Sequence, residues 1–255
     1  MPRGLSVHKV TILYKFLYNI FIIMNVFILD KIAKSIIKEE INIVGIHGPQ
    51  GIGKTTLNKF LYNELSKDYN VIVLSLDDYY LPYIEMNKFL ESCNDDLYKF
   101  RGLAGTHDLK LLFNTLINLK NNKKTLIPKY DKSLYNGFGD RIGYMENNKR
   151  IDIIILEGWM LGYKPIKNNL NCELNIFNDN LKKYDDIQKL INIWIILETD
   201  DLNNIFEWRL NAEPDGGMDL DTFKKFMEPY FVIYKNYSVD GNKIIVNKNR
   251  EIVKC

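Results

Sequence analysis

The sequence contains little cysteine, no marked excess of either charge and few long hydrophobic runs. Its 255 residues include three cysteines, Cys93, Cys172 and Cys255, which are widely separated and match no metal-ligand spacing. This pattern argues against a disulfide framework or a cysteine-ligated metal site, and it favours a reducing compartment such as the cytoplasm. The net charge is +2. Nucleic-acid-binding proteins normally have a clear basic excess, so we expect no nucleic-acid partner.

Residues 10–29 form a mostly apolar stretch, close to the roughly 20 residues that span a bilayer. Lys15, Asn19 and Asn25 interrupt it, which makes it a poor membrane span. Its apolar residues recur at helical spacing, and basic residues flank it. We therefore expect residues 1–40 to be a helical extension or an organelle-targeting segment rather than a membrane anchor. Residues 41–255 contain no Pro/Gly/Ser-rich linker and are predicted to form one domain.

A glycine-rich run with the P-loop spacing G-x-x-x-x-G-K-[ST] begins at Gly48. An apolar, strand-like segment precedes it and a helix-like segment follows, which is the context that the motif requires. The glycines let the backbone aim its N–H groups at phosphate oxygens, and the helix adds the positive end of its dipole. Lys54 is expected to reach the β- and γ-phosphates of ATP, and Thr55 to bind Mg²⁺. The predicted nucleotide-binding residues are Gly48, Pro49, Gln50, Gly51, Ile52, Gly53, Lys54, Thr55 and Thr56.

Apolar runs alternate with helix-like segments after the P-loop. The predicted strands are 70–76, 151–156, 193–197 and 243–246, and the predicted helices are 109–120, 174–191, 201–212 and 219–237. This alternation predicts an α/β fold of the P-loop NTPase type, with a doubly wound, mainly parallel sheet flanked by helices and a short lid. Residues 125–150 are polar and glycine-containing, and we expect loops there. Ligands of such sheets bind beyond the carboxyl ends of the strands.

Two acidic residues stand at predicted strand ends. Asp77 follows the strand after the P-loop helix, where a carboxylate can face the γ-phosphate and accept a proton from the acceptor. Asp78 is its neighbour, and we expect only one of the two to point into the site. Glu157 ends the buried-type strand at 151–156 and is predicted to meet Mg²⁺ or to position a nucleophile. Both positions are also compatible with ordinary capping of the next segment.

Further polar residues are concentrated in two loops, 101–108 and 128–141. Their arginine and lysine side chains suit an anionic acceptor, and the histidine and aspartate side chains suit hydrogen bonds to acceptor hydroxyls. The candidate acceptor-binding residues are Asp77, Tyr80, Arg101, His107, Asp108, Tyr130, Lys132 and Arg141. Composition leaves a structural role equally open for His107 and Asp108, the latter as a helix cap. Arg209 lies on a predicted lid helix, where it would stabilise charge on the transferred phosphoryl group or form a surface ion pair.

These motifs together resemble the plant and fungal D-glycerate 3-kinase family. The resemblance rests on the P-loop, Leu-Asp-Asp-Tyr-Tyr, Arg-Gly-Leu-Ala-Gly-Thr-His-Asp, Pro-Lys-Tyr-Asp-Lys-Ser, Leu-Glu-Gly-Trp-Met-Leu-Gly-Tyr and Trp-Arg-Leu-Asn-Ala-Glu, in that order along the chain. More distantly, the pattern is similar to uridine kinase, pantothenate kinase and phosphoribulokinase. The resemblance implies phosphoryl transfer from ATP, with Mg²⁺, to D-glycerate, and it implies that Asp77 is the base and that Asp108 and Tyr130 lie in acceptor-binding loops.

The chain departs from that family after its Trp-Arg-Leu-Asn-Ala-Glu motif. Members usually have a longer segment there, often with a basic residue, whereas this chain has the short and acidic Pro214-Asp215-Gly216-Gly217. Two alternatives stay open, and the shortened lid motivates the second of them. One is a uridine or pantothenate kinase of the same fold, and the other is a regulatory protein that binds ATP without transferring phosphate.

Overall fold

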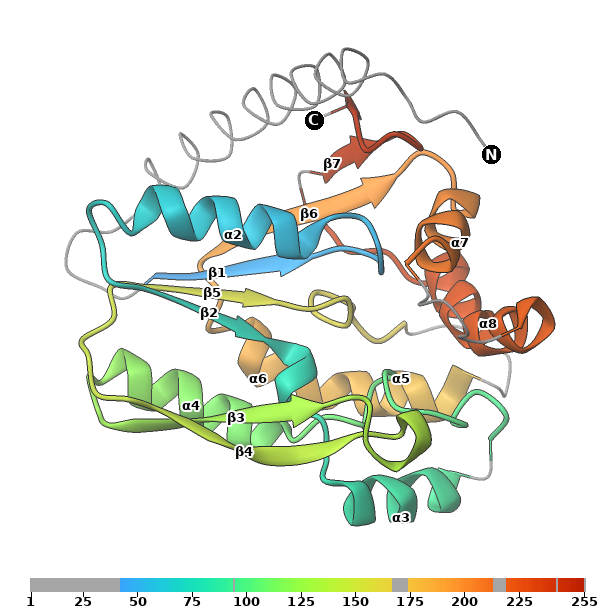
Figure 1. Cartoon of the computed structure of the whole chain (residues 1–255), viewed down its shortest axis with the longest axis horizontal. Coiled ribbons are helices and arrows are strands. Elements are labelled where there is room, and N and C mark those ends of the chain that lie inside the picture. Colours follow the sequence, from blue (N-terminus) through green and yellow to red (C-terminus); the bar gives the residue numbers. More distant parts are fainter. Residues whose placement is uncertain (1–41, 94, 167–173, 213–218, 242, 255) are drawn as a thin grey trace, which may run out of the picture.

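The computed structural model describes residues 42–93, 95–166, 174–212, 219–241 and 243–254. A six-stranded sheet with the order β2-β5-β1-β6-β7-β8 forms its centre (Figure 1). The strands are β1 (Asn42–His47), β2 (Val71–Ser75), β5 (Ile153–Glu157), β6 (Ile193–Thr199), β7 (Lys243–Val246) and β8 (Ile252–Lys254). All neighbours pair in parallel except β7 and β8. The predicted α/β sheet is confirmed. The extension at 1–40 and the segment Pro214–Gly217 lie outside the described residues.

Helices cover both faces of the sheet. Helix α2 (Lys54–Leu65) lies on one face, and the helices on the other face include α4 (Leu109–Lys120), α5 (Asn175–Leu181) and α6 (Asp185–Gln188) (Figure 1). The other described helices are α3 (Tyr83–Cys93), α7 (Asn203–Leu210) and α8 (Leu220–Asn236), with short 3-10 turns η1 (Leu76–Tyr79), η2 (Tyr135–Gly137) and η4 (Lys182–Tyr184). The predicted helix at 174–191 is thus broken into α5, η4 and α6. Within the described ranges, no helix combines the length and the apolarity that crossing a membrane would need.

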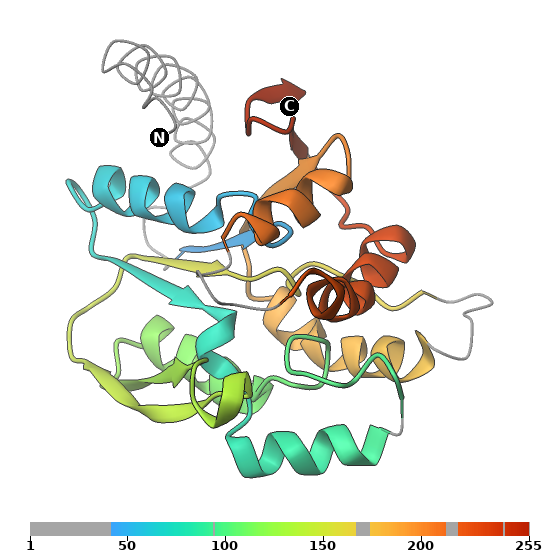
Figure 2. The same cartoon turned by 45° about the vertical axis from the view of Figure 1, so that its right-hand side comes forward.

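The prediction of loops over 125–150 is wrong. Strands β3 (Thr125–Asp131) and β4 (Asp140–Asn147) pair antiparallel and form a hairpin beside α4, separate from the main sheet (Figures 1 and 2). The sequence did not predict these strands because Pro128 and Gly143 are both unfavourable inside a central strand. A two-stranded sheet has only edges, and edge strands tolerate proline. The hairpin brings Tyr130, Lys132 and Arg141 toward the carboxyl end of β2.

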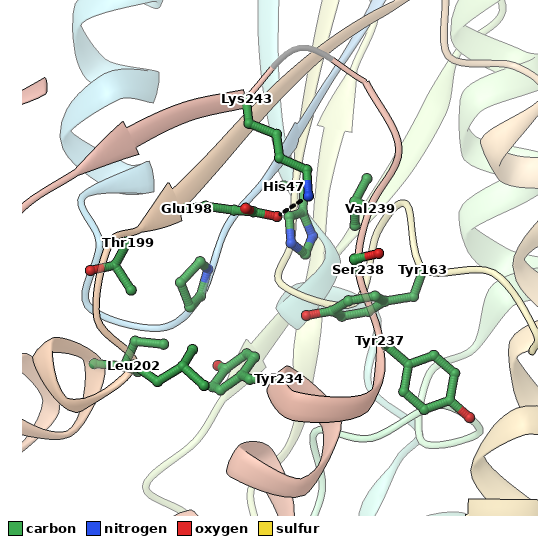
Figure 3. A pocket seen from close by; sticks show the side chains of 12 residues that line it. His47, Tyr163, Glu198, Thr199, Leu202, Tyr234, Tyr237, Ser238, Val239 and Lys243 are labelled. Carbon is green, nitrogen blue, oxygen red and sulfur yellow. Dashed lines mark ion pairs between the residues drawn. The ribbon is translucent and has the colours of Figure 1, made fainter. Parts of the chain in front are cut away.

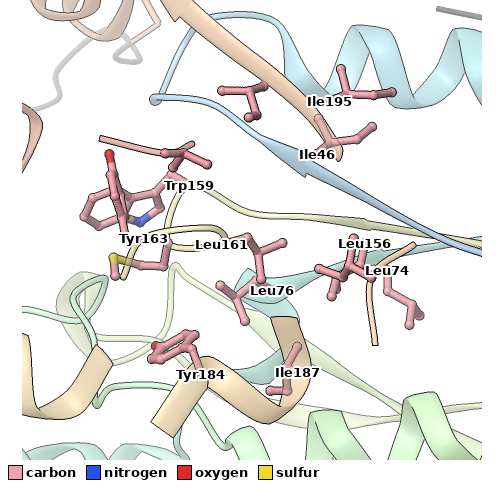
Figure 4. Packing of buried hydrophobic residues seen from close by; sticks show 14 of the residues in the cluster. Ile46, Leu74, Leu76, Leu156, Trp159, Leu161, Tyr163, Tyr184, Ile187 and Ile195 are labelled. Atoms are coloured by element: carbon pink, nitrogen blue, oxygen red, sulfur yellow. The ribbon is translucent and has the colours of Figure 1, made fainter. Parts of the chain in front are cut away.

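The core fixes the carboxyl ends of the strands in place. All four residues Ile153–Leu156 of β5 are fully buried, as expected for a parallel strand covered on both faces. Figure 4 shows Leu74, Leu76 and Leu156 packed in the layer that also contains Tyr184 and Ile187 from η4 and α6. Leu76 and Tyr79 have no exposed surface and flank the two aspartates of η1. This packing anchors η1 and therefore the carboxylates that follow β2.

Candidate active site

Three strands end at the same level and bring the predicted acidic and phosphate-binding residues together. In the sheet register Glu157 of β5 pairs with Ile46 of β1 on one side and with Ser75 of β2 on the other. The P-loop leaves β1 directly after this row, and η1 leaves β2 at the same edge. The strand register therefore brings the P-loop, Asp77 and Glu157 together at one edge of the sheet, as predicted.

The P-loop has the backbone and the charge that an anion site needs. Gly51 and Gly53 have φ angles of 79° and 112°, in a region that residues other than glycine rarely adopt. In the described part of the chain no side chain caps the start of α2, so its first N–H groups remain for a ligand. The Lys54 Nζ donates to the Gly48 and Pro49 carbonyl oxygens, at 2.8 and 3.0 Å. Burial lowers the pKa of Lys54, and the carboxylates of Glu157 and Asp77 oppose that shift.

These features fit the triphosphate of a nucleotide, and the neighbouring oxygen donors fit a magnesium ion. Thr55 is exposed in the first turn of α2, and the Glu157 Oε1 accepts a 2.5 Å hydrogen bond from the Ser75 hydroxyl. Burial raises the pKa of Glu157, with the Lys54 ammonium acting in the opposite direction. The residues that the structure describes contain no group of three or more His, Cys, Asp or Glu side chains placed to bind a metal. Magnesium in phosphoryl-transfer sites needs no such cage, because phosphates and waters supply most of its ligands.

Asp77 is held by two side chains from different elements. Its Oδ2 lies 2.5 Å from the Nζ of Lys132, which directly follows the hairpin strand β3, and its Oδ1 accepts a 3.0 Å hydrogen bond from the Tyr80 hydroxyl. Burial by itself raises the pKa of Asp77, but the charge and hydrogen bond of Lys132 outweigh it, so the pKa lies below the usual value. Asp78 turns away to the hairpin, where it contacts the Lys129 Nζ and the Tyr130 N–H. As predicted, only one of the two aspartates faces the P-loop lysine.

The loop at 101–108 and the hairpin meet around Asp108. The Arg141 Nη2 donates to the Asp108 Oδ2 at 3.1 Å and to the Tyr80 carbonyl at 3.2 Å, and the Asp108 Oδ1 caps α4 by accepting from the Leu111 N–H. The predicted cap is confirmed. Arg141, which we expected to face an anionic acceptor, directs Nη2 to these protein groups. Its side chain therefore joins the hairpin to the loop.

His107 and Tyr80 form the wall of the site beside Asp77. Their rings stack with centroids 4.5 Å apart, and the edge of Tyr130 lies against Tyr80 at 5.3 Å. The His107 Nδ1 is hydrogen-bonded to the Tyr184 hydroxyl at 2.7 Å. Its Nε2 is buried and has no hydrogen-bond partner among the residues described. Because burial lowers the pKa of His107 to about 4, the ring is neutral at neutral pH and leaves one polar atom for a ligand.

The two predicted arginines outside this group lie at different places. Arg101 donates to the Gly137 carbonyl of the hairpin turn, and its guanidinium lies 5.8 Å from the Tyr80 ring centroid. Arg209 lies in the last turn of α7, and a Cβ built on Gly51 would be 3.7 Å from its backbone N. Arg101 therefore borders the acceptor side of the site and Arg209 the nucleotide side.

Sequence reasoning missed Ser75, Tyr230 and Tyr234. Ser75 was visible as a polar residue ending an apolar strand, and it orients Glu157. Tyr230 and Tyr234 occur four residues apart on the amphipathic helix α8, a spacing typical of core residues. In addition, the Tyr230 hydroxyl donates to the Arg101 carbonyl, and the Tyr234 hydroxyl accepts from the Gln50 N–H of the P-loop. Helix α8 thus contacts both the nucleotide side and the acceptor side, which no local pattern indicates.

A separate cavity of about 180 Å³ lies behind the P-loop (Figure 3). Lys243 and Glu198 form an ion pair at 2.8 Å in its wall, and the buried His47 lines it with its Nδ1 bonded to the Leu161 carbonyl. Burial lowers the pKa of His47 to about 3, so this ring is neutral. Of the predicted site residues that the structure describes, Pro49 is the one in this wall. The cavity is therefore distinct from the site around Asp77.

Gly105 shapes the loop that carries His107 and gives a stability prediction. Its φ is +101°, and a Cβ there would lie 2.8 Å from the Asn180 Cγ and against the Phe89 ring. We expect Gly105→Ala to lower the free energy of unfolding by about 2–4 kcal/mol, since it adds backbone strain to overpacking. Gly137→Ala is the matched control, because Gly137 has φ +91° but open space around its Cβ position. Urea unfolding measures both, and an equal loss in the two variants would contradict the steric explanation.

Comparison with known proteins identifies the family. The solved structure of D-glycerate 3-kinase from Cryptococcus neoformans matches with a TM-score of 0.80 at 30% identity, covering 90% of this chain and 96% of that one. The chain belongs to the D-glycerate 3-kinase family. A "probable ATP-dependent kinase TDA10" from Saccharomyces cerevisiae is 35% identical over 224 residues, 76% of each chain. This member of the family is accordingly an ATP-dependent kinase with a P-loop.

Two further matches differ in extent. The chloroplastic D-glycerate 3-kinase of Arabidopsis thaliana is 35% identical over 219 residues, 76% of this chain. The match covers 47% of the plant protein, so this chain spans about half of that relative's length. A family model described as an NB-ARC domain matches residues 27–77, a span that includes β1, the P-loop, α2 and β2.

Proposed function

We propose that this kinase transfers the γ-phosphoryl group of ATP to the primary hydroxyl of D-glycerate, giving ADP and 3-phosphoglycerate. The observation that carries the proposal is the pairing of Asp77 with Lys132 within the electrostatic reach of Lys54. A base, a cation for an acceptor carboxylate and the P-loop lysine are thereby gathered at one sheet edge. The names of the Cryptococcus and Arabidopsis relatives support the same substrate.

On the nucleotide side, the P-loop N–H groups and Lys54 bind the triphosphate and stabilise the charge that develops on it. Thr55 and Glu157 would hold Mg²⁺, with Ser75 fixing the carboxylate of Glu157. The bound ion supplies charge neutralisation at the phosphate oxygens. Arg209, at the nucleotide side, adds positive charge near the transferred group. The remaining P-loop residues and Thr56 shape the cradle.

On the acceptor side, Asp77 takes the proton of the primary hydroxyl while the hydroxyl oxygen bonds to the γ-phosphorus. The bond between that phosphorus and the β–γ bridging oxygen breaks, and its electron pair leaves with ADP. Lys132 and Arg101 hold the glycerate carboxylate, and the His107 Nε2 and the Tyr130 hydroxyl meet its other oxygens. Arg141 contributes by fixing Asp108 and the Tyr80 backbone.

An acceptor panel tests this function. Purified protein with Mg²⁺ and ATP is given D-glycerate, glycerol, uridine or pantothenate, and ADP release and the phosphorylated product are measured. We expect D-glycerate to stimulate ADP release most strongly and to be phosphorylated at C3. A preference for uridine or pantothenate would replace the proposal with one of those activities. ATP binding without stimulation by any acceptor would favour the non-catalytic alternative.

A further inference from the structure

Both oxygens of Asp77 are engaged in this structure, and the two partners differ in how firmly they are held. Tyr80 is 4% exposed, and its ring is packed between His107 and Tyr130. The Lys132 side chain is 52% exposed, and it follows the last residue of β3 at the start of a turn. Solvent-exposed ion pairs are weak and exchange readily with competing ions. Lys132 is therefore the partner of Asp77 that another anion can displace.

Each of the three other cations on the acceptor side has a protein partner that is not the proposed base. Lys129 pairs with Asp78 at 3.1 Å, and Arg141 pairs with Asp108 at 3.1 Å. Arg101 donates to the Gly137 carbonyl. Lys132 differs from these three because its partner is the proposed base. As long as Lys132 stays on Asp77, the ammonium reduces the affinity of that carboxylate for a proton.

We infer that Lys132 selects acceptors that have a carboxylate, because the acceptor's carboxylate draws the Lys132 ammonium away from Asp77 and so frees the base for the hydroxyl. The inference rests on the proposed function. The exchange breaks one ion pair and forms another, with no covalent change. In D-glycerate the carboxylate and the primary hydroxyl belong to one short molecule, so a small swing of Lys132 serves both. Glycerol has the same primary hydroxyl without the anion, and it leaves Lys132 on Asp77.

Lys132→Met tests the inference through the ratio of kcat/KM for D-glycerate to kcat/KM for glycerol. For D-glycerate the variant is expected to lose about 10- to 100-fold, the scale of one charge-assisted hydrogen bond. For glycerol kcat/KM is expected to stay level or rise, because Asp77 is no longer masked. Lys132→Arg should keep most of the preference for D-glycerate. Lys129→Met is the matched control, since Lys129 lies on β3, shortly before Lys132, and pairs with Asp78 instead.

The outcomes separate the inference from the proposed function. If Lys132→Met leaves the ratio of the two kcat/KM values unchanged, for example through equal losses on both acceptors, the inference is overturned. The proposed function would still stand, provided that the wild-type protein prefers D-glycerate. Wild-type protein that prefers glycerol or uridine, or phosphorylates none of the acceptors, would overturn the function and the inference together. A collapse of the ratio in Lys132→Met, with Lys129→Met like wild type, supports both.

Discussion

Lys54→Ala is expected to lower kcat for acceptor phosphorylation by about 10³-fold, because it removes a preorganised cation from the triphosphate. In this structure the Nζ lies across its own loop, on the Gly48 and Pro49 carbonyl oxygens. It is thus already positioned above the phosphate cradle and needs little rearrangement to meet β- and γ-oxygens. Steady-state ADP release with saturating acceptor gives kcat, and calorimetry gives the affinity for ATP.

Lys59→Ala is the control for this experiment. Lys59 is on the same helix α2, but its side chain is exposed on the surface. We expect near wild-type kcat for Lys59→Ala, since surface substitutions away from special features change little. Thermal melting checks that both variants fold. A folded Lys54→Ala variant with more than about a tenth of wild-type kcat would contradict the assigned role, given the loss expected for a preorganised donor.

The central sheet and the nucleotide half of the site could be predicted because their signals are local. The apolar run that ends at Leu156 predicts a buried parallel strand, and the P-loop motif predicts a strand, a turn and a helix. The rule that ligands bind beyond strand ends then placed Asp77 and Glu157 at one edge. The register confirmed this placement, with Glu157 between Ile46 and Ser75.

The acceptor half could be predicted as a set of residues but not as a set of contacts. Lys132 and Asp77 are 55 positions apart, and Arg141 and Asp108 are 33 apart. Their pairing depends on the hairpin, which was not predicted because its strands contain Pro128 and Gly143. Tertiary packing determines which side chain an arginine or a lysine contacts. The sequence alone therefore could not show that Lys132 contacts the base while Arg141 joins two elements.

The same limit explains why the role of α8 was missed. Tyr230 and Tyr234 have the spacing of buried helix residues, and they are indeed packed against Trp159. Their hydroxyls, however, contact Arg101 and the P-loop. A hydroxyl at the end of an apolar ring is compatible with both roles. Only the three-dimensional arrangement shows that these tyrosines join the two halves of the site.

Asp77→Asn is expected to lower kcat by about 10²-fold or more, the usual contribution of a general base. Asparagine has the shape of aspartate and can still accept the hydrogen bond that the Tyr80 hydroxyl donates to Oδ1. It cannot take the acceptor's proton, because an amide is not a base at neutral pH. ATP affinity is expected to be nearly unchanged, since the P-loop contacts of Lys54 do not involve this carboxylate. Single-turnover phosphoryl transfer and ATP binding measure the two effects separately.

Asp78→Asn makes this test specific to the one carboxylate. Asp78 is the next residue in the same η1 turn, but it bonds to Lys129 and the Tyr130 N–H. Its removal is expected to weaken the attachment of the hairpin and to change kcat by less than about 10-fold, since one partly exposed ion pair contributes little. A variant Asp77→Asn with near-full activity, or an Asp78→Asn variant that loses more than Asp77→Asn, would remove Asp77 from the role of base. If Asp77→Asn loses more kcat than Asp78→Asn, the directions of the two side chains explain why Asp77 is the base. Asp77 faces the P-loop lysine, whereas Asp78 faces the hairpin.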